Sequence, residues 1–336
     1  MIKTINIDDI VLRLFNENGV VYPCHIENSP HYKLLCGERE PYDEYVKLMG
    51  ELGRAKSGYM STSDYLEFYL TFDYLGPMYN TELIMCKSIG HRYESWDGDH
   101  RLACLLKQKV GKVKVDEVYG EFKHIGFSNL IDIVGIMDGL EDCAIIKSEE
   151  FFPNYYDYDD LDIICRDRDS LTDIILGRLE FLKEYKYDIK VNKKTGRNHI
   201  DVTKPLAKRL NFRFDIMDEF PYHIPHQQIS IDVNKEYLKV MLDRKESKDV
   251  MKPEAYIGEG KLSFLNETDD LVIRFLEWAW QPHKMRHITA VRDLYKNENE
   301  FLELINKYTN VGISKEYMKT VFDDLEKRED YEREML

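Results

Sequence analysis

The residue types best suited to chemistry stand in one strand-turn-helix pattern that runs from Tyr93 to Leu106. Its turn groups acidic, small and basic residues: Asp97, Gly98, Asp99, His100 and Arg101. A glycine lets the backbone approach a ligand closely, and the first N–H groups of a helix, with a histidine and an arginine beside them, suit a phosphate. Asp99 is well placed to cap the helix. The pattern therefore predicts a phosphate-binding turn.

A second set of candidate residues is acidic and belongs to apolar segments. Asp160 and Asp162 precede Ile163, and in a strand their side chains point to the same side, roughly 7 Å apart. Asp215 leaves the face opposite to Phe212 and Phe214, so another carboxylate emerges from a buried strand. Carboxylates at this separation can hold hard divalent cations such as Mg²⁺. We expect Asp160 and Asp162 to bind the metal.

Composition limits the class of protein. The chain has 336 residues, 43% of them hydrophobic, which is enough for a large core and favours two domains. The net charge of −15 argues against a nucleic-acid partner, because phosphate neutralisation needs a basic face. The cysteines show no paired metal-ligand spacing, so neither zinc nor a disulfide framework is indicated.

The sequence also bears on location. No apolar stretch approaches the roughly 20 residues that span a bilayer, and the first ten residues do not resemble a signal peptide. We expect a cytoplasmic protein without a membrane partner. The charged amphipathic helix expected over residues 317–336 would dock on its own chain or in a homodimer.

Periodicity predicts the elements that position these residues. In residues 1–125, helical spacing covers residues 42–75, and strands are expected at 81–86, 91–96 and 111–118. In residues 126–336, short strands are expected at 143–146 and 156–165, a hairpin over 187–202 and a strand at 210–217. Helices fill the remainder. The fold class is therefore α/β (α+β) in two domains, 1–125 and 126–336.

The string Asp-Gly-Asp-His-Arg-Leu-Ala resembles the Asp-Gly-x-His-Arg box of the ParB/sulfiredoxin-like superfamily. The resemblance implies that Asp97, Gly98 and Asp99 bind nucleotide phosphates and that His100 and Arg101 offset charge on the transferred group. In the kinase branch, a Glu after the first strand acts on a substrate hydroxyl.

Glu27 matches that glutamate best, with Glu38 and Glu40 as competitors. Sulfiredoxin-type reduction is disfavoured because Asp99 stands where the reactive cysteine is expected. DNA partitioning is disfavoured by the acidic composition.

The second half resembles the nucleotidyltransferase fold, which has a Gly-Ser turn, an Asp-x-Asp strand about a dozen residues later and a third carboxylate on a neighbouring strand. The resemblance implies that Lys147 and Ser148 form the phosphate-binding turn and that Asp160 and Asp162 hold two metal ions. Asp215 would be the third carboxylate, with Asp201 as competitor. Lys147 departs from the family because it replaces the usual glycine, although a lysine can bind phosphate as a point charge.

Together these features predict a Mg²⁺-dependent phosphoryl and nucleotidyl transferase. It would use a nucleoside triphosphate, ATP or CTP, and a small hydroxyl-bearing metabolite, with surface polysaccharide precursors as one product class. Two alternatives stay open. In one, only the ParB-like unit is active and the second unit binds substrate. In the other, the chain is a nucleotide-gated binding or regulatory protein.

Overall fold

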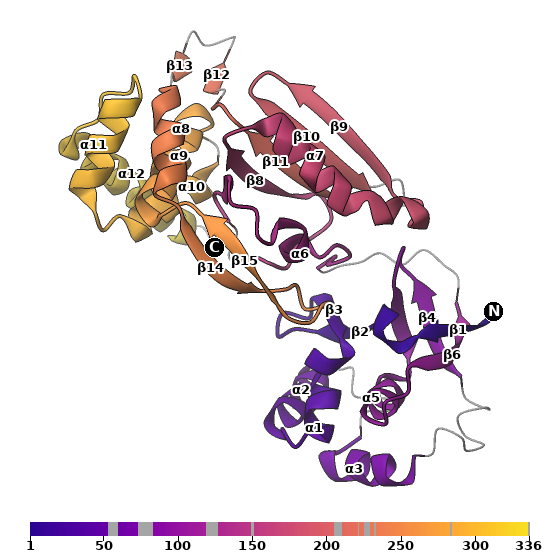
Figure 1. Ribbon diagram of the computed structural model, residues 1–336. Helices are drawn as coiled ribbons and strands as arrows, with labels where there is room; N and C mark the ends of the chain where they lie inside the picture. The colour runs from indigo at the N-terminus through magenta and orange to yellow at the C-terminus, as the bar shows by residue number, and fades with distance from the viewer. Residues whose placement is uncertain are drawn as a thin grey trace.

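The structure of the chain is a computed structural model. It describes residues 1–52, 60–72, 83–118, 127–148, 151–204, 210–220, 222–224, 229–231, 233–282 and 284–334. The strands form two mixed sheets and a separate two-stranded sheet, and helices cover them (Figure 1). The expected α/β class is confirmed, because mixed sheets and helices make up the structure. The predicted domain boundary after residue 125 lies outside the described residues.

The first sheet has the strand order β1-β6-β4-β5-β2-β3. Its strands are β1 (Ile2–Asn6), β2 (Ile10–Phe15), β3 (Val21–His25), β4 (Ile84–Ser88), β5 (Tyr93–Asp97) and β6 (Lys112–Glu117). The pairs β2–β5 and β4–β6 are parallel, and the other neighbours are antiparallel. In β6, Val113 and Val115 are buried while Lys112 and Lys114 are exposed, which is the alternation that the sequence predicts.

Short helices gather on one side of this sheet (Figure 1). They are η1 (Ile7–Asp9), η2 (Ile26–Asn28), α1 (Pro30–Leu35), α2 (Glu40–Glu51), α3 (Thr62–Thr71) and α5 (Asp99–Lys107). Their apolar faces and the strands share one core, in which Leu102 and Leu105 of α5 are fully buried. Burial of this stripe fixes the start of α5, the predicted phosphate-binding turn, at the end of β5.

The second sheet has the strand order β14-β15-β7-β8-β11-β10-β9. Its strands are β7 (Cys143–Ile145), β8 (Asp159–Cys165), β9 (Asp188–Lys194), β10 (Arg197–Thr203), β11 (Leu210–Met217), β14 (Glu246–Met251) and β15 (Glu259–Phe264). Strands β8 and β11 are parallel, as are β15 and β7. The expected hairpin is present, and β12 (Tyr222–Ile224) pairs with β13 (Ile229–Ile231) apart from this sheet.

Helices cover both faces of the second sheet. They are α6 (Ile133–Met137), α7 (Arg168–Leu179), η3 (Glu180–Tyr185), α8 (Lys235–Asp243), α9 (Glu267–Trp280), α10 (Met285–Leu294), α11 (Glu298–Tyr308) and α12 (Lys315–Glu334). Leu161, Ile163 and Cys165 of β8 pack with α6 and α7, whereas Ile164 packs with α8 to α12. Side chains alternate along a strand, so Asp160 and Asp162 lie on the same face as Ile164, the face of the C-terminal helices.

The loop between β14 and β15 contacts the first half of the chain (Figure 1). The carbonyl of Glu254 accepts hydrogen bonds from His25 N at 2.7 Å and from Asn28 Nδ2 at 3.2 Å. Arg92 donates to the carbonyl of Ala255, and its guanidinium lies 4.5 Å from the ring centre of Tyr256. Within the described parts of the chain, every helix is too short or too polar to cross a membrane.

Candidate functional site

Three carboxylates converge on the second sheet because of the register of two parallel strands. Asp162 of β8 pairs with Asp215 of β11, and Asp160 pairs with Arg213. One ligand oxygen from each of Asp160, Asp162 and Asp215 lies within 4.8 Å of the other two. The structure thus brings together the three carboxylates that the sequence indicates. It places the competitor Asp201 on β10, where Arg213 Nε donates to it at 2.6 Å.

Asp215 is the most buried of the three carboxylates, and β10 supplies its neighbours. Arg197 Nε lies 3.3 Å and His199 Nε2 lies 3.5 Å from Asp215 Oδ1. Neither Oδ1 nor His199 Nε2 has a hydrogen-bond partner among the described residues. Burial, together with the carboxylates of Asp162 and Asp160, raises the pKa of Asp215 to about 7 against the opposing effect of Arg197. Asp215 is therefore only partly ionised at neutral pH, and a further positive charge beside it would favour its charged form.

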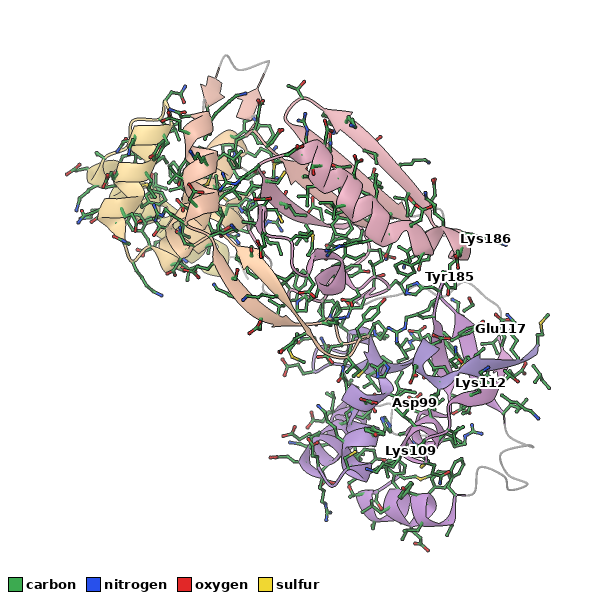
Figure 2. All side chains as sticks on the ribbon, in the orientation of Figure 1. Asp99, Lys109, Lys112, Glu117, Tyr185 and Lys186 are labelled. Atoms are coloured by element: carbon green, nitrogen blue, oxygen red, sulfur yellow. The ribbon has the colours of Figure 1, made fainter. Side chains whose placement is uncertain are left out.

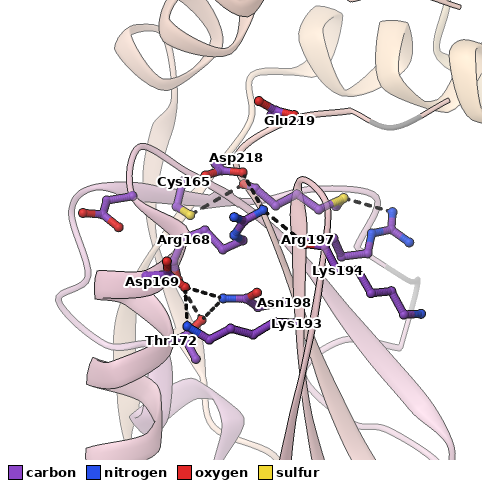
Figure 3. A network of polar contacts seen from close by, with 12 residues as sticks. Cys165, Arg168, Asp169, Thr172, Lys193, Lys194, Arg197, Asn198, Asp218 and Glu219 are labelled. Carbon is purple, nitrogen blue, oxygen red and sulfur yellow. Dashed lines mark hydrogen bonds and ion pairs between the residues drawn. The ribbon is translucent and has the colours of Figure 1, made fainter. Parts of the chain in front are cut away.

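A polar network braces the β9–β10 hairpin that carries Arg197 (Figure 3). Asp169 of α7 accepts from Lys193 Nζ at 2.8 Å and from Asn198 Nδ2 at 3.0 Å. Arg168 forms an ion pair with Asp218 at 3.2 Å. These contacts tie the hairpin to the start of α7, so Arg197 and His199 are held beside Asp215. No local sequence pattern indicates either residue, since the contact joins separate strands.

The turn after β7 is anchored to α9. Asp270 Oδ1 accepts from the backbone N–H of Lys147 at 2.6 Å, and Arg274 Nη2 donates to the carbonyl of Ser148 at 3.1 Å. Arg274 Nε also pairs with Asp270 Oδ2 at 2.7 Å. The Lys147 ammonium lies 2.9 Å from Asp162 Oδ2, so the turn reaches the carboxylates. The expected phosphate-binding role of Lys147 stays a prediction, and this ammonium already has a carboxylate partner.

A cavity of about 300 Å³ opens beside these groups. Its polar lining includes Lys147, Ser148, Asp160, Asp162, Arg286 and His287. Its aromatic lining includes Phe151, Phe152, Tyr155, Tyr158 and Phe212. A cavity of this size with a charged part and an aromatic part has the composition of a small-ligand site.

His287 is the most informative group in the cavity lining. It is 2% exposed, and neither ring nitrogen has a hydrogen-bond partner in the described part of the chain. Burial and the nearby Lys147 and Arg286 lower its pKa to about 3, so the imidazole is neutral at neutral pH. Helix α10 buries the ring against the cavity.

The carboxylates suit a hard divalent cation. Oxygens that share one Mg²⁺ lie roughly 3–4 Å apart, and those around Ca²⁺ roughly 3–5 Å apart, given their usual bond lengths. The separations of at most 4.8 Å fit the larger cation directly and Mg²⁺ after a small contraction. None of the described residues donates a hydrogen bond to the buried Asp215 Oδ1, which leaves a lone pair available. The donor set fits a metal but does not select Mg²⁺.

The turn before α5 differs from the prediction in one respect. Gly98, with a φ of +107°, is the N-cap of α5 and has no side chain with which to cap the helix, so Asp99 is not the N-cap residue. Asp99 is instead the first helical residue, where it accepts from Ser95 Oγ at 2.5 Å (Figure 2). Burial and the neighbouring Asp97 raise the pKa of Asp99 to about 6 despite that hydrogen bond. The left-handed glycine explains the difference, because it turns Asp99 inward.

The histidine of the box packs among aromatic side chains. Tyr42 Oη and His100 Nε2 are 2.7 Å apart, and Tyr65 donates to the carbonyl of His100 at 3.2 Å. Burial lowers the pKa of His100 to about 4, so at neutral pH it hydrogen-bonds but brings no positive charge. Arg101 Nη2 lies 3.5 Å from Asp97 Oδ2. Arg101 is therefore the cation of this turn.

Glu27 lies in η2, directly after β3, with its side chain exposed, and η2 contacts α5. Glu38 precedes α2, and Glu40 is its first residue, also exposed. The contact between η2 and α5 favours Glu27 over its two competitors as the neighbour of the box. The role of Glu27 stays a prediction.

No known protein family, curated protein or solved structure matches the chain. The resemblances to the ParB/sulfiredoxin-like and nucleotidyltransferase folds therefore rest on the motifs and the geometry given above. Both assignments stay predictions.

Proposed function

We propose that the chain is a divalent-cation-dependent phosphoryl or nucleotidyl transferase whose main reaction centre is the cavity beside Asp160, Asp162 and Asp215. Its donor substrate is a nucleoside triphosphate, ATP or CTP, and its acceptor is a small hydroxyl-bearing metabolite. The first half of the chain would contribute a ParB/sulfiredoxin-like, kinase-type site, and the second half a nucleotidyltransferase-like one.

One observation carries this proposal. Carboxylates from two neighbouring strands converge beside a cavity whose lining also includes the exposed Ser148 and the buried His287, which has no hydrogen-bond partner among the described residues. A buried polar group without a partner costs free energy, roughly 1–3 kcal/mol, so its persistence at a cavity wall points to a ligand that completes it. A purely structural acidic cluster would not need a cavity or an open imidazole.

The chemistry of each side chain at the cavity indicates its role. Asp160, Asp162 and Asp215 would hold the cation, which when bound would stabilise negative charge on a phosphoryl oxygen. Arg286 and the hydroxyl of Ser148 would bind phosphate oxygens at the cavity wall. The neutral ring of His287 would accept a hydrogen bond from the acceptor hydroxyl. The aromatic lining would stack on the base or the sugar.

In the first half of the chain, the proposal depends on the box. Arg101 and the N–H groups that follow Gly98 would bind the nucleotide phosphates, together with Asp97 and Asp99 at the same turn. His100 would act as a hydrogen-bonding group, since its low pKa keeps it neutral. Glu27 would accept the proton of the attacking hydroxyl. The first half would then make a phosphate monoester that the second half activates, as in the synthesis of surface polysaccharide precursors.

A second candidate function has its own support. Lys147 already supplies a positive charge to Asp162, so the carboxylate cluster is partly neutralised without a cation. This favours a nucleotide-gated binding or regulatory protein, in which the second half binds a ligand without turnover.

Calorimetric titration of ATP and CTP separates these functions when it is combined with turnover. The transferase predicts that Mg²⁺ strengthens nucleotide binding and that Asp160→Asn with Asp162→Asn removes the Mg²⁺ effect. Binding that is tight, independent of Mg²⁺ and without any product would favour the regulatory protein. An absence of nucleotide binding would contradict both.

A further inference from the structure

The backbone of Lys147 adopts a conformation that usually belongs to glycine. Its φ is +52°, in the left-handed region, where a side chain is strained. Lys186 has a similar φ of +64°, but its side chain is exposed at the end of η3, at the edge of the second half (Figure 2). The side chain of Lys147 is only 8% exposed. Position 147 thus carries a buried cation, although a glycine there would relieve the backbone strain.

The ammonium of Lys147 joins two carboxylates from different elements. Its Nζ lies 2.9 Å from Asp162 Oδ2 of β8 and 3.5 Å from Glu277 Oε2 of α9. Glu277 has a second cation, because Lys284 Nζ lies 2.6 Å from its Oε1. Lys284 therefore neutralises the charge of Glu277, and the Lys147 ammonium mainly neutralises the charge of Asp162.

We propose that the Lys147 ammonium is a tethered cation that takes the place of one of two metal ions, so that the carboxylate cluster binds a single divalent cation. This inference rests on the proposed function. Lys147 and Arg197, the latter 3.3 Å from Asp215, already offset two of the three negative charges of Asp160, Asp162 and Asp215. One divalent cation therefore more than neutralises the cluster, and a second would leave a large excess of positive charge.

The contact between Asp162 Oδ2 and the Lys147 ammonium also supports a single metal ion. A second divalent cation would also need free carboxylate oxygens as ligands. Oδ2 already accepts the ammonium, which leaves Oδ1 for the metal. The anchoring of the backbone N–H of Lys147 by Asp270 at 2.6 Å holds the ammonium in this place. Replacement of Lys147 by glycine would leave Asp162 Oδ2 and its negative charge available to a second metal ion.

The test is a titration of the full chain with Mn²⁺ as the probe, followed by electron paramagnetic resonance of the free ion. We expect one Mn²⁺ per wild-type chain and two per Lys147→Gly chain, with spin coupling between the two ions. Lys186→Gly is the matched control, since it removes a lysine and relieves a similar φ far from the cluster. The Lys186→Gly chain should still bind one Mn²⁺ ion. Lys147→Arg keeps the charge and should also bind one.

Two Mn²⁺ ions on the wild-type chain, both lost in Asp160→Asn with Asp162→Asn, would overturn the inference and leave the proposed function standing. A single ion on Lys147→Gly, folded as judged by its circular dichroism, would also overturn the inference. An absence of Mn²⁺ binding by the wild type would instead contradict the proposed function. The number of Mn²⁺ ions on the wild-type chain already separates these outcomes. The inference can therefore be tested even if the Lys147→Gly variant does not fold.

Discussion

Asp162 of β8 and Asp215 of β11 are direct partners in the parallel pairing of the two strands. Paired residues of neighbouring strands point to the same face, so this register places both carboxylates beside the C-terminal helices. A slip of one residue would turn Asp215 into the core that Phe212 and Phe214 form with α7. The carboxylate cluster therefore depends on the same alternation that builds the core.

Crowding of the three carboxylates predicts a stability effect. Asp215→Asn removes a buried charge that faces two like charges, so we expect the cation-free protein to melt several degrees higher, at about 2–4 °C per kcal/mol. The same variant should lose the stabilisation that Mn²⁺ or Mg²⁺ gives the wild type. Differential scanning fluorimetry with and without the cation measures both. A lower melting temperature for Asp215→Asn in the absence of cation would contradict the account.

The buried His287 predicts opposite effects on stability and on activity. His287→Leu removes a buried imidazole that has no hydrogen-bond partner within the described ranges, and we expect it to stabilise the protein by roughly 1 kcal/mol while it lowers nucleotidyl transfer at least tenfold. Pyrophosphate release and thermal melting measure the two effects.

His31 offers a matched control, because it is also buried with neither ring nitrogen hydrogen-bonded in the part of the chain that the structure describes, but it packs in the first half of the chain. His31→Leu should stabilise the protein and leave pyrophosphate release unchanged. Unchanged pyrophosphate release in His287→Leu would remove His287 from the site.

Buried histidines predict an acid-sensitive first half. His31 packs edge-on against His100 and lies among Tyr42, Tyr45 and Tyr65. Burial lowers the pKa of His31 well below its usual value and that of His100 to about 4. A lowered folded-state pKa means that the unfolded chain binds more protons, so stability is complete above pH ~6.5 and falls toward pH ~4. A shift of this size in His100 is worth about 3 kcal/mol.

Urea melts between pH 7 and pH 4, followed by tyrosine fluorescence, measure this loss. His31→Phe keeps the aromatic packing and removes one titrating ring, so its stability should vary less with pH than that of the wild type. An equal pH dependence in the two proteins would contradict a role for His31.

The contact between the two halves predicts a steric effect at Gly90. Gly90 has a φ of +105°, and a Cβ added there would lie 2.3 Å from Tyr187 Oη. Gly90→Ala should push the halves apart and lower the melting temperature. Gly37 has a φ of +100° with open space around it, so Gly37→Ala carries the backbone strain alone. Small-angle scattering should show a larger radius of gyration for Gly90→Ala only. Equal radii for the two variants would show that Tyr187 yields without separating the halves.

The sequence predicts local features better than long-range contacts. The alternation around Asp160 and Asp162 and the opposite facing of Phe212 and Asp215 follow from strand geometry, and the structure confirms both. The N-cap of α5 is wrong in the sequence analysis because the choice between Gly98 and Asp99 depends on a φ angle. The pairing of Lys147 with Glu277, 130 positions apart in the numbering, and the burial of His287 come from packing of α9 and α10. No local pattern contains them.

The most direct test of the central claim is phosphorus NMR of the purified chain with Mg²⁺, each of ATP, CTP, GTP and UTP, and a pool of polyols and sugars. The account predicts pyrophosphate and a new nucleotide ester with the wild type, and neither with Asp160→Asn and Asp162→Asn combined. A monoester with a nucleoside diphosphate would report separately on the first half. Product formation that is unchanged in the double variant, or no product from any nucleotide, would contradict the claim.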